Sequence, residues 1–434
     1  MTLACAGIAD AAQKPRTAVK PKPPTARVVK APGYDQLMKT YQMAPGSLGF
    51  LAIDAKSGRV LAARAPDQLF IPASSIKAAT AVAALNILGG TYRFETSIHT
   101  KGSVKDGILY GDVILRGGGD PVLTTEDLNT LIAALKSKGI KSIKGRFVYD
   151  DTMFPTQKAI ESGDDQELAY NPGVGPLSLN FNRVRLRWVM KTKNGPLVQM
   201  LSKTDRMEVP VDFVGAAIAP NGVRTRYGVA YDDRSSPPRW LLTQGARRRG
   251  EMWLPVRRPA LHVVDVFRKR AAQEGLTLPA AVAGKLPPDA VFVAKHHSKP
   301  LPAILREVLK YSNNMAAELA GMVAANKLTG KPLGVTPSAL ALAEWYKRTG
   351  PQTNWNGILL ENHSGLSTRS RITPRQLVAI LRYARRQSFA GHTLEGLLRP
   401  YWIAGRRVSR KMSMSTVFEG KRKARGAVIT VPRH

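Results

Sequence analysis

Cysteine is almost absent from this sequence, because Cys5 is the only one among 434 residues. An intramolecular disulfide framework and a cysteine-ligated metal site are therefore both excluded. No apolar run approaches the roughly 18 residues that a membrane-spanning helix needs, so the sequence predicts no transmembrane span. The histidines show no metal-ligand spacing with carboxylates, and Gly117-Gly118-Gly119 lacks the lysine and hydroxyl residue of a phosphate loop. The sequence predicts neither a metal nor a cofactor.

Acidic residues are scarce. The chain has 31 Asp and Glu against 65 Lys and Arg, which gives a formal net charge of +34. Such a charge suits nucleic acid, an anionic membrane or an acidic polymer as a partner. The basic residues are not gathered into one binding element, and no helix-turn-helix, zinc-finger or RRM signature is present. We expect a basic protein in an anionic environment that binds no nucleic acid; nucleic-acid binding is the remote alternative.

The N-terminal segment has the features of an export sequence. Residues 1–13 include "LACAGIADAA", which resembles the end of a signal peptide, with small residues near Ala9 and Ala11, although the positively charged start is absent. Residues 14–33 are basic and proline-rich, as in an extended linker. These features predict an exported, periplasmic protein whose folded part begins after the linker.

Two α-rich segments flank a β-rich one. Residues 34–91 and 289–406 are expected to form one domain, and residues 92–288 a large insert of short strands with helices near 125–138 and 259–274. In the first segment we predict two strands within 48–68, around a turn at Lys56-Ser57-Gly58. A helix should follow from about 75 to 88 and end at Gly89-Gly90.

The second α-rich segment should contain several helices. Two are expected on either side of a break near Ser312, and others over 338–349 and 373–386. The last should begin with a capping box, because Thr373 supplies the N-cap, Pro374 the first helical position and Gln376 the returning side chain. The sequence therefore predicts a mixed α/β (α+β) protein.

A serine and a lysine three residues apart mark the first helix. Ser74 should lie where the loop enters the helix, where backbone N–H groups favour negative charge. The spacing places Lys77 on the same helical face, and burial among alanines should lower its pKa so that a neutral amine can take the serine proton. Ser75 cannot do this, because Ala78 follows it at that spacing. The alternative is a capping serine and an ordinary surface lysine.

A second Ser-x-Asn element lies in the break between the later helices. Ser312 could relay a proton to a leaving amine, and Asn314 could hydrogen-bond a substrate amide. The alternative for Ser312 is a helix N-cap. A similar triplet, Ser178-Leu179-Asn180, lies in the β-rich segment, away from Ser74.

Together these are the S-x-x-K and S-x-N elements of penicillin-recognising serine enzymes. Ser74 and Ser312 are 238 positions apart. With this spacing the sequence resembles the D-alanyl-D-alanine carboxypeptidase/endopeptidases with a large insert, which are low-molecular-mass class C penicillin-binding proteins. "LRGGGDPVLTTEDL", "GPLSLNFNRV", "LPVRRPALHVVDVFR" and "NHSGLSTRSRITPRQL" are similar to segments of that family. The resemblance covers about residues 34–405.

This resemblance implies a β-lactamase/transpeptidase-like domain with a large β-rich insert. It implies that Ser74 attacks the D-Ala-D-Ala carbonyl, with Lys77 as the base, Ser312 as a proton shuttle and Asn314 orienting the substrate. Peptidoglycan stem peptides would be the substrates and β-lactams acylating inhibitors. The oligomeric state stays open.

The family's third element, Lys-Thr-Gly on a late strand, does not occur in this chain. Residues 407–434 look like an atypical basic tail, as in a frameshifted reading, so the C-terminal strands are expected to be missing or replaced. Lys56-Ser57-Gly58 imitates the missing element, but its early place in the chain predicts only a turn. The alternative function is a non-catalytic cationic protein that binds cell-wall polymer.

Overall fold

The computed structural model describes residues 33–44, 46–191, 193, 195–223, 225, 227–398, 401–403 and 406–408. The expectations for the export segment, the linker up to residue 32 and the tail from residue 409 lie outside these residues. The chain divides into two units, residues 1–44 and 45–434. Helix α1 belongs to the first unit, and everything below concerns the second. None of the described helices is long and apolar enough to cross a membrane.

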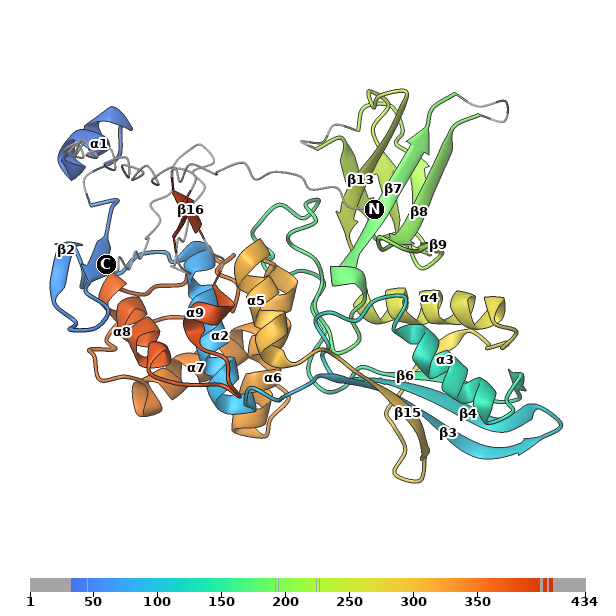
Figure 1. The fold of residues 1–434 in the computed structure, drawn as a ribbon. Helices are drawn as coiled ribbons and strands as arrows, with labels where there is room; N and C mark the ends of the chain where they lie inside the picture. The colour runs from blue at the N-terminus through green and yellow to red at the C-terminus, as the bar shows by residue number, and fades with distance from the viewer. Residues whose placement is uncertain are drawn as a thin grey trace, which may run out of the picture. The chain divides into compact units, whose positions relative to one another are not determined.

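The elements follow in chain order (Figure 1). In the described residues the helices are α1 Tyr34–Thr40, α2 Ile76–Leu88, α3 Leu128–Ser137, α4 Pro259–Gln273, α5 Leu301–Tyr311, α6 Asn314–Thr329, α7 Val335–Thr349, α8 Pro374–Arg385 and α9 Leu394–Leu397. The strands there are β1 Phe50–Ile53, β2 Val60–Arg64, β3 Glu95–Lys105, β4 Ile108–Gly117, β5 Ser142–Ile143, β6 Phe147–Asp150, β7 Arg183–Val189, β8 Leu197–Lys203, β9 Glu208–Pro210, β10 Gly215–Ile218, β11 Val229–Asp232, β12 Arg239–Leu242, β13 Arg249–Pro255, β14 Ala281–Ala283, β15 Val291–His297, β16 Tyr401–Ile403 and β17 Arg406–Val408.

Helix α2 is the central helix of the α-rich part. Its sequence IKAATAVAALNIL is rich in alanine, the best helix former, and every residue from Ile76 to Leu85 is buried. A helix that is apolar all round belongs in a core, and α2 contacts α5, α6, α7 and α8. It ends at Gly89, whose φ of +90° is readily adopted only by glycine. The predicted helix and its glycine stop are confirmed.

Strands β1 and β2 form an antiparallel hairpin in which Phe50 pairs with Arg64. The turn at Lys56-Ser57-Gly58 is held by Asp54, whose Oδ1 accepts hydrogen bonds from the backbone N–H groups of Lys56 and Ser57 at 3.1 and 2.8 Å. The predicted hairpin is confirmed. The Lys56-Ser57-Gly58 triplet forms the turn between the two strands.

Three sheets are formed by the β-rich segment, and one of them also includes β15, which lies just after residue 288 and pairs with β3. A mixed sheet has the order β14-β6-β4-β3-β15, with β5 beside β4; β13-β7-β8-β9 is antiparallel; and β10-β12-β11 is mixed. Helices α3 and α4 lie side by side near the first sheet (Figure 1). One hydrophobic cluster contains buried residues from Ile98 to Leu278, whereas the helices α2, α7 and α8 share another. The expected domain boundaries stay a prediction.

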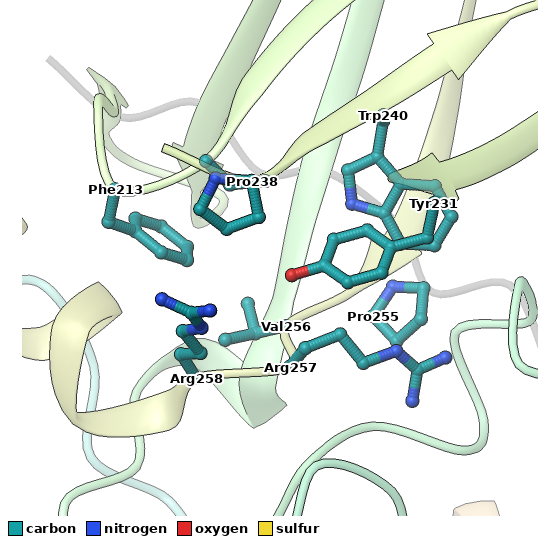
Figure 2. Close-up of a pocket in the computed structure, with 9 residues that line it drawn as sticks. Phe213, Tyr231, Pro238, Trp240, Pro255, Val256, Arg257 and Arg258 are labelled. Atoms are coloured by element: carbon teal, nitrogen blue, oxygen red, sulfur yellow. The ribbon is translucent and has the colours of Figure 1, made fainter. Parts of the chain in front are cut away.

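The long connection between β6 and β7 contacts α6 of the α-rich part and is anchored by a buried arginine. Arg257 follows β13 and lies beside a small pocket that Tyr231 and Arg258 also line (Figure 2). Its Nη1 donates hydrogen bonds to the carbonyl oxygens of Lys158 and Asn171 at 3.0 and 2.8 Å. These bonds hold the part of the connection that reaches the candidate site.

Candidate active site

Ser74 lies in a tight 3₁₀ turn, Ala73–Ser75, immediately before α2. Ala73 has a φ of +47°, a conformation that costs energy for a residue with a side chain. Ser75 is buried, and its Oγ donates to the carbonyl oxygen of Pro72 at 2.6 Å. Ser74, by contrast, is exposed. The turn therefore presents one of the two adjacent hydroxyls to solvent and uses the other to hold the backbone.

Lys77 points back at Ser74 from the first turn of α2. Its Nζ is 2.9 Å from Ser74 Oγ and donates to the carbonyl oxygen of Ser364 at 2.7 Å. Only 2% of the residue is exposed. Burial lowers the pKa of Lys77 to about 7, and the Glu318 carboxylate opposes part of that decrease. A large share of the side chain is therefore a neutral amine near neutral pH.

Ser312 reaches Ser74 from the break between α5 and α6. It ends α5 in the left-handed conformation, with φ +56° and ψ +38°. This geometry brings its Oγ to 2.9 Å from Ser74 Oγ. The N-cap of α6 is Asn313, whose side chain accepts a hydrogen bond from the N–H of Ala316. The N-cap interpretation of Ser312 is therefore wrong.

Asn314 lies two residues after Ser312, at the start of α6. Its Nδ2 donates to the carbonyl oxygen of Tyr170 at 2.9 Å. Tyr170 precedes Asn171 in the connection that Arg257 anchors. The structure thus joins Ser74, Lys77 and Ser312 by hydrogen bonds. Asn314 instead donates its hydrogen bond to Tyr170 of the β-rich segment, at the rim of the site.

The Ser178-Leu179-Asn180 triplet is packed inside the β-rich segment. Ser178 Oγ donates to the carbonyl oxygen of Gly175 at 2.8 Å, and Asn180 Nδ2 donates to Thr125 Oγ1 and Ser202 Oγ at 2.8 and 2.9 Å. Both side chains are buried. They hold the local fold and present no free hydroxyl to a substrate.

The segment "NHSGLSTRSRITPRQL" was identified only as similar to the family, and sequence reasoning missed that its first residues form the loop that contacts Lys77. Its members His363, Ser364 and Gly365 are buried or seated against the nucleophile turn. Glu318 of α6 is fully buried, and its carboxylate accepts hydrogen bonds from the backbone N–H groups of His363 and Ser364 in this loop. The available signal was a single carboxylate inside the apolar run "NMAAELAGMVAA", because a charge there requires specific partners.

The arrangement suits acyl transfer. A serine hydroxyl is a weak nucleophile until a nearby base takes its proton, and the buried amine of Lys77 lies within hydrogen-bond distance of it. A second hydroxyl, that of Ser312, lies 2.9 Å from Ser74 Oγ and can carry a proton onward. Among the described residues, no group of three or more His, Cys, Asp or Glu side chains is placed to hold a metal ion.

A family model matches most of the chain. The model of the D-Ala-D-Ala carboxypeptidase 3 (S13) family of peptidases matches residues 35–427. The chain belongs to this family. The matched range takes in the α-rich segments, the β-rich segment and part of the tail that the sequence marked as atypical.

Two curated relatives and one solved structure are similar to the chain. D-alanyl-D-alanine carboxypeptidase DacB of Haemophilus influenzae is 24% identical over 82% of this chain and 75% of its own length. The D-alanyl-D-alanine carboxypeptidase of an Actinomadura species is 26% identical over 77% of this chain and 63% of its own length. The crystal structure of penicillin binding protein 4 (dacB) from Haemophilus influenzae matches with a TM-score of 0.65, at 23% identity, over 77% of this chain and 74% of that one. The expected fold is confirmed by this last likeness.

Proposed function

We propose that the protein is a serine-type D-Ala-D-Ala carboxypeptidase/endopeptidase that acts on peptidoglycan stem peptides. One observation carries the proposal. Ser74 Oγ lies 2.9 Å from both Lys77 Nζ and Ser312 Oγ, and the pKa of the buried lysine is lowered to about 7. The S13 family match and the two carboxypeptidase relatives support the same substrate class.

The acylation step uses three side chains. Lys77 Nζ takes the hydroxyl proton of Ser74 as Oγ bonds to the carbonyl carbon of the penultimate D-alanine. When the tetrahedral intermediate collapses, the C–N bond breaks and the proton passes through Ser312 to the leaving amine. D-alanine departs and an ester to Ser74 remains. Asn314, which bonds Tyr170 here, would orient the substrate amide.

Deacylation reverses the proton path. A water molecule gives a proton to the base as it attacks the ester carbonyl, and Ser74 leaves as a hydroxyl. A cross-linked stem peptide would be cut in the same way. A β-lactam would acylate Ser74 like the peptide, and the Haemophilus influenzae protein has been solved in complex with a β-lactam. Such a substrate would require a working site outside the cytoplasmic membrane, and we propose the periplasm as its compartment.

The direct test is release of D-alanine from a synthetic stem peptide that ends in D-Ala-D-Ala, with the same peptide ending in D-Ala-L-Ala as control. We expect release only from the first peptide and only when Ser74 is present. Release by a Ser74→Ala variant at the parent rate would contradict the assignment of the nucleophile. No release by either protein over a prolonged incubation would contradict the function.

A further inference from the structure

Glu318 is a charged residue in the interior of the α-rich part. It lies on α6 and has no solvent exposure. Its Oε2 accepts the backbone N–H of His363 at 3.0 Å, and its Oε1 accepts the N–H of Ser364 at 2.8 Å. Burial raises the pKa of Glu318, whereas these hydrogen bonds and the nearby Lys77 oppose the increase. Two N–H donors, one on each oxygen, favour the ionised form.

The loop residue that Glu318 binds also binds Lys77. Ser364 donates its N–H to Glu318, and its carbonyl oxygen accepts a hydrogen bond from Lys77 Nζ at 2.7 Å. Glu318 and Lys77 therefore bind the two backbone polar groups of one residue. A buried carboxylate on α6 and a buried amine on α2 are coupled through that backbone.

Further contacts fix the loop on both sides. The carbonyl oxygen of His363 accepts from Thr80 Oγ1 of α2 at 2.8 Å, and His363 Nε2 is 2.9 Å from Ser338 Oγ of α7. Three helices thus contribute bonds to two consecutive loop residues. Removing the Glu318 bonds would leave two buried N–H groups unpaired next to the lysine that serves as the base.

The charges around Lys77 are few. Ser74 and the Ser364 carbonyl contact it as neutral groups, and Ser312, also neutral, bonds Ser74. His363 in the same loop is neutral, because burial lowers its pKa to about 3. Among the described residues, Glu318 is the charged group whose field acts on the lysine.

We propose that Glu318 is a positioning residue for the acylation step: its carboxylate holds the Ser364 backbone against Lys77 and supplies the counter-charge for the proton that Lys77 receives. This inference rests on the proposed function, because it assigns Glu318 to the base of that reaction. The role requires no contact between Glu318 and the substrate. It predicts two separable effects, one on the geometry of Lys77 and one on its protonation.

The first test is the pH dependence of acylation by benzylpenicillin in the full 434-residue chain and its Glu318→Gln variant. Glutamine has nearly the same shape as glutamate, but it is neutral and turns an N–H₂ group towards one of the loop donors. Without the negative charge Lys77 loses its proton more easily, so the acid limb of the rate profile should move to lower pH by about one pH unit or more. The plateau should fall by about 10-fold to 10²-fold because Lys77 is less well held.

Two further variants separate charge from geometry. Glu318→Asp keeps the charge on a shorter side chain. The pH midpoint of the acid limb of its acylation profile should therefore stay near that of the parent, while the maximal acylation rate on the plateau falls. Glu361→Gln removes a carboxylate that borders the same loop but pairs with Arg369; it should change neither quantity. A lower plateau with an unmoved midpoint in Glu318→Gln would mean a merely structural role and overturn the proposal. If Glu318→Gln does not fold, an unaltered plateau in Glu318→Asp overturns it instead.

The second test needs no turnover. The pKa of Lys77 can be measured by ¹³C NMR of labelled lysine Cε, with the resonance assigned by its loss in Lys77→Arg. We expect a lower pKa in Glu318→Gln than in the parent, and an equal or higher one would overturn the proposal. If the parent is never acylated but the pKa of Lys77 is still lower in Glu318→Gln than in the parent, the proposed function is contradicted. The coupling of Glu318 to Lys77 is then still supported.

Discussion

Gly365 lies against the turn that carries Ser74. Its φ is +77°, and a Cβ at this position would stand 1.9 Å from the carbonyl oxygen of Ala73. Real atoms do not approach so closely, so any side chain must displace either the nucleophile turn or the loop. Because Ser364 in this loop holds Lys77, the glycine couples the nucleophile to its base by close backbone approach.

We expect Gly365→Ala to slow acylation of Ser74 by at least about 10²-fold, since misplacing a reacting group by about 1 Å has an effect of that size. The matched control is Gly330→Ala, which has a φ of +67° but no atom within 4 Å of the added Cβ. That change should cost only about 1 kcal/mol of stability and leave the rate unchanged. The measurement is the second-order rate constant for benzylpenicillin; equal rates in both variants would contradict the close-approach argument.

The residues of the site could be predicted only where they are close in sequence or belong to a recognised motif. The three-residue spacing of Ser74 and Lys77 was enough to predict that their side chains lie close together. The distance of 2.9 Å between Ser74 Oγ and Lys77 Nζ confirms this proximity. The contact between Lys77 and Ser364 spans 287 positions, so no local pattern could predict it. The same holds for Tyr170 and Asn314, whose bond crosses from one segment of the chain to another.

At the scale of elements, α8 shows how local sequence fixes a helix start. The capping box predicted for this helix is confirmed, because Thr373 Oγ1 accepts from the N–H of Gln376 at 3.0 Å and Gln376 Oε1 accepts from the N–H of Thr373 at 2.9 Å. Ile372, just before the cap, exchanges backbone hydrogen bonds with Phe70 at 3.0 and 3.1 Å. The start of α8 is therefore tied to the strand-like segment that leads into the nucleophile turn.

Thr373→Val should lower the free energy of unfolding by about 1 kcal/mol, because the shape is kept while the capping hydroxyl is lost. Thr393→Val is the control, since Thr393 caps only the four-residue α9, and its effect should be smaller. Urea unfolding of both variants and the parent measures the difference. A Thr373→Val protein as stable as the parent would show that the cap contributes nothing to this helix.

The helices near the site could be predicted because their signals are local: an alanine-rich run with a glycine stop for α2, a cap for α8, and a break near Ser312. The left-handed conformation of Ser312 in that break was not predicted. The arrangement of the β-rich segment could not be predicted. Its sheets combine strands that are distant in sequence, such as the parallel pair β6 and β14, and parallel pairing has no turn signal to announce it.

At the scale of the whole chain, the missing Lys-Thr-Gly element matters most. Strands β1 and β2 form a two-stranded sheet within the described residues, and no Lys-Thr-Gly occurs anywhere in the 434 residues. The family resemblance implies a strand with this element that docks the peptide and binds its carboxylate. An extended substrate gains much of its affinity by pairing with such a strand.

We therefore expect the 434-residue chain to be acylated more slowly, by at least about 10²-fold, than a version in which residues 407–434 are replaced by a Lys-Thr-Gly strand and its family neighbours. Ser74 and Lys77 belong to the segment before the tail and lie within hydrogen-bond distance of each other, so we expect residual acylation to remain. Intact-mass spectrometry over time with excess benzylpenicillin measures both rates. Rapid, stoichiometric labelling of the unaltered chain would show that the tail is no obstacle.

The central claim is that Ser74, paired with Lys77, is the nucleophile. It is tested most directly by mapping the benzylpenicillin adduct to a peptide by mass spectrometry after a prolonged incubation of the chain, Ser74→Ala and Ser75→Ala. Ser75 is the matched control because its buried hydroxyl bonds Pro72. The account predicts an adduct on Ser74 in the parent, none in Ser74→Ala and a retained adduct in Ser75→Ala. An adduct on another residue, or no adduct in any of the three proteins, would contradict it, and the second outcome would favour a cationic cell-wall-binding protein.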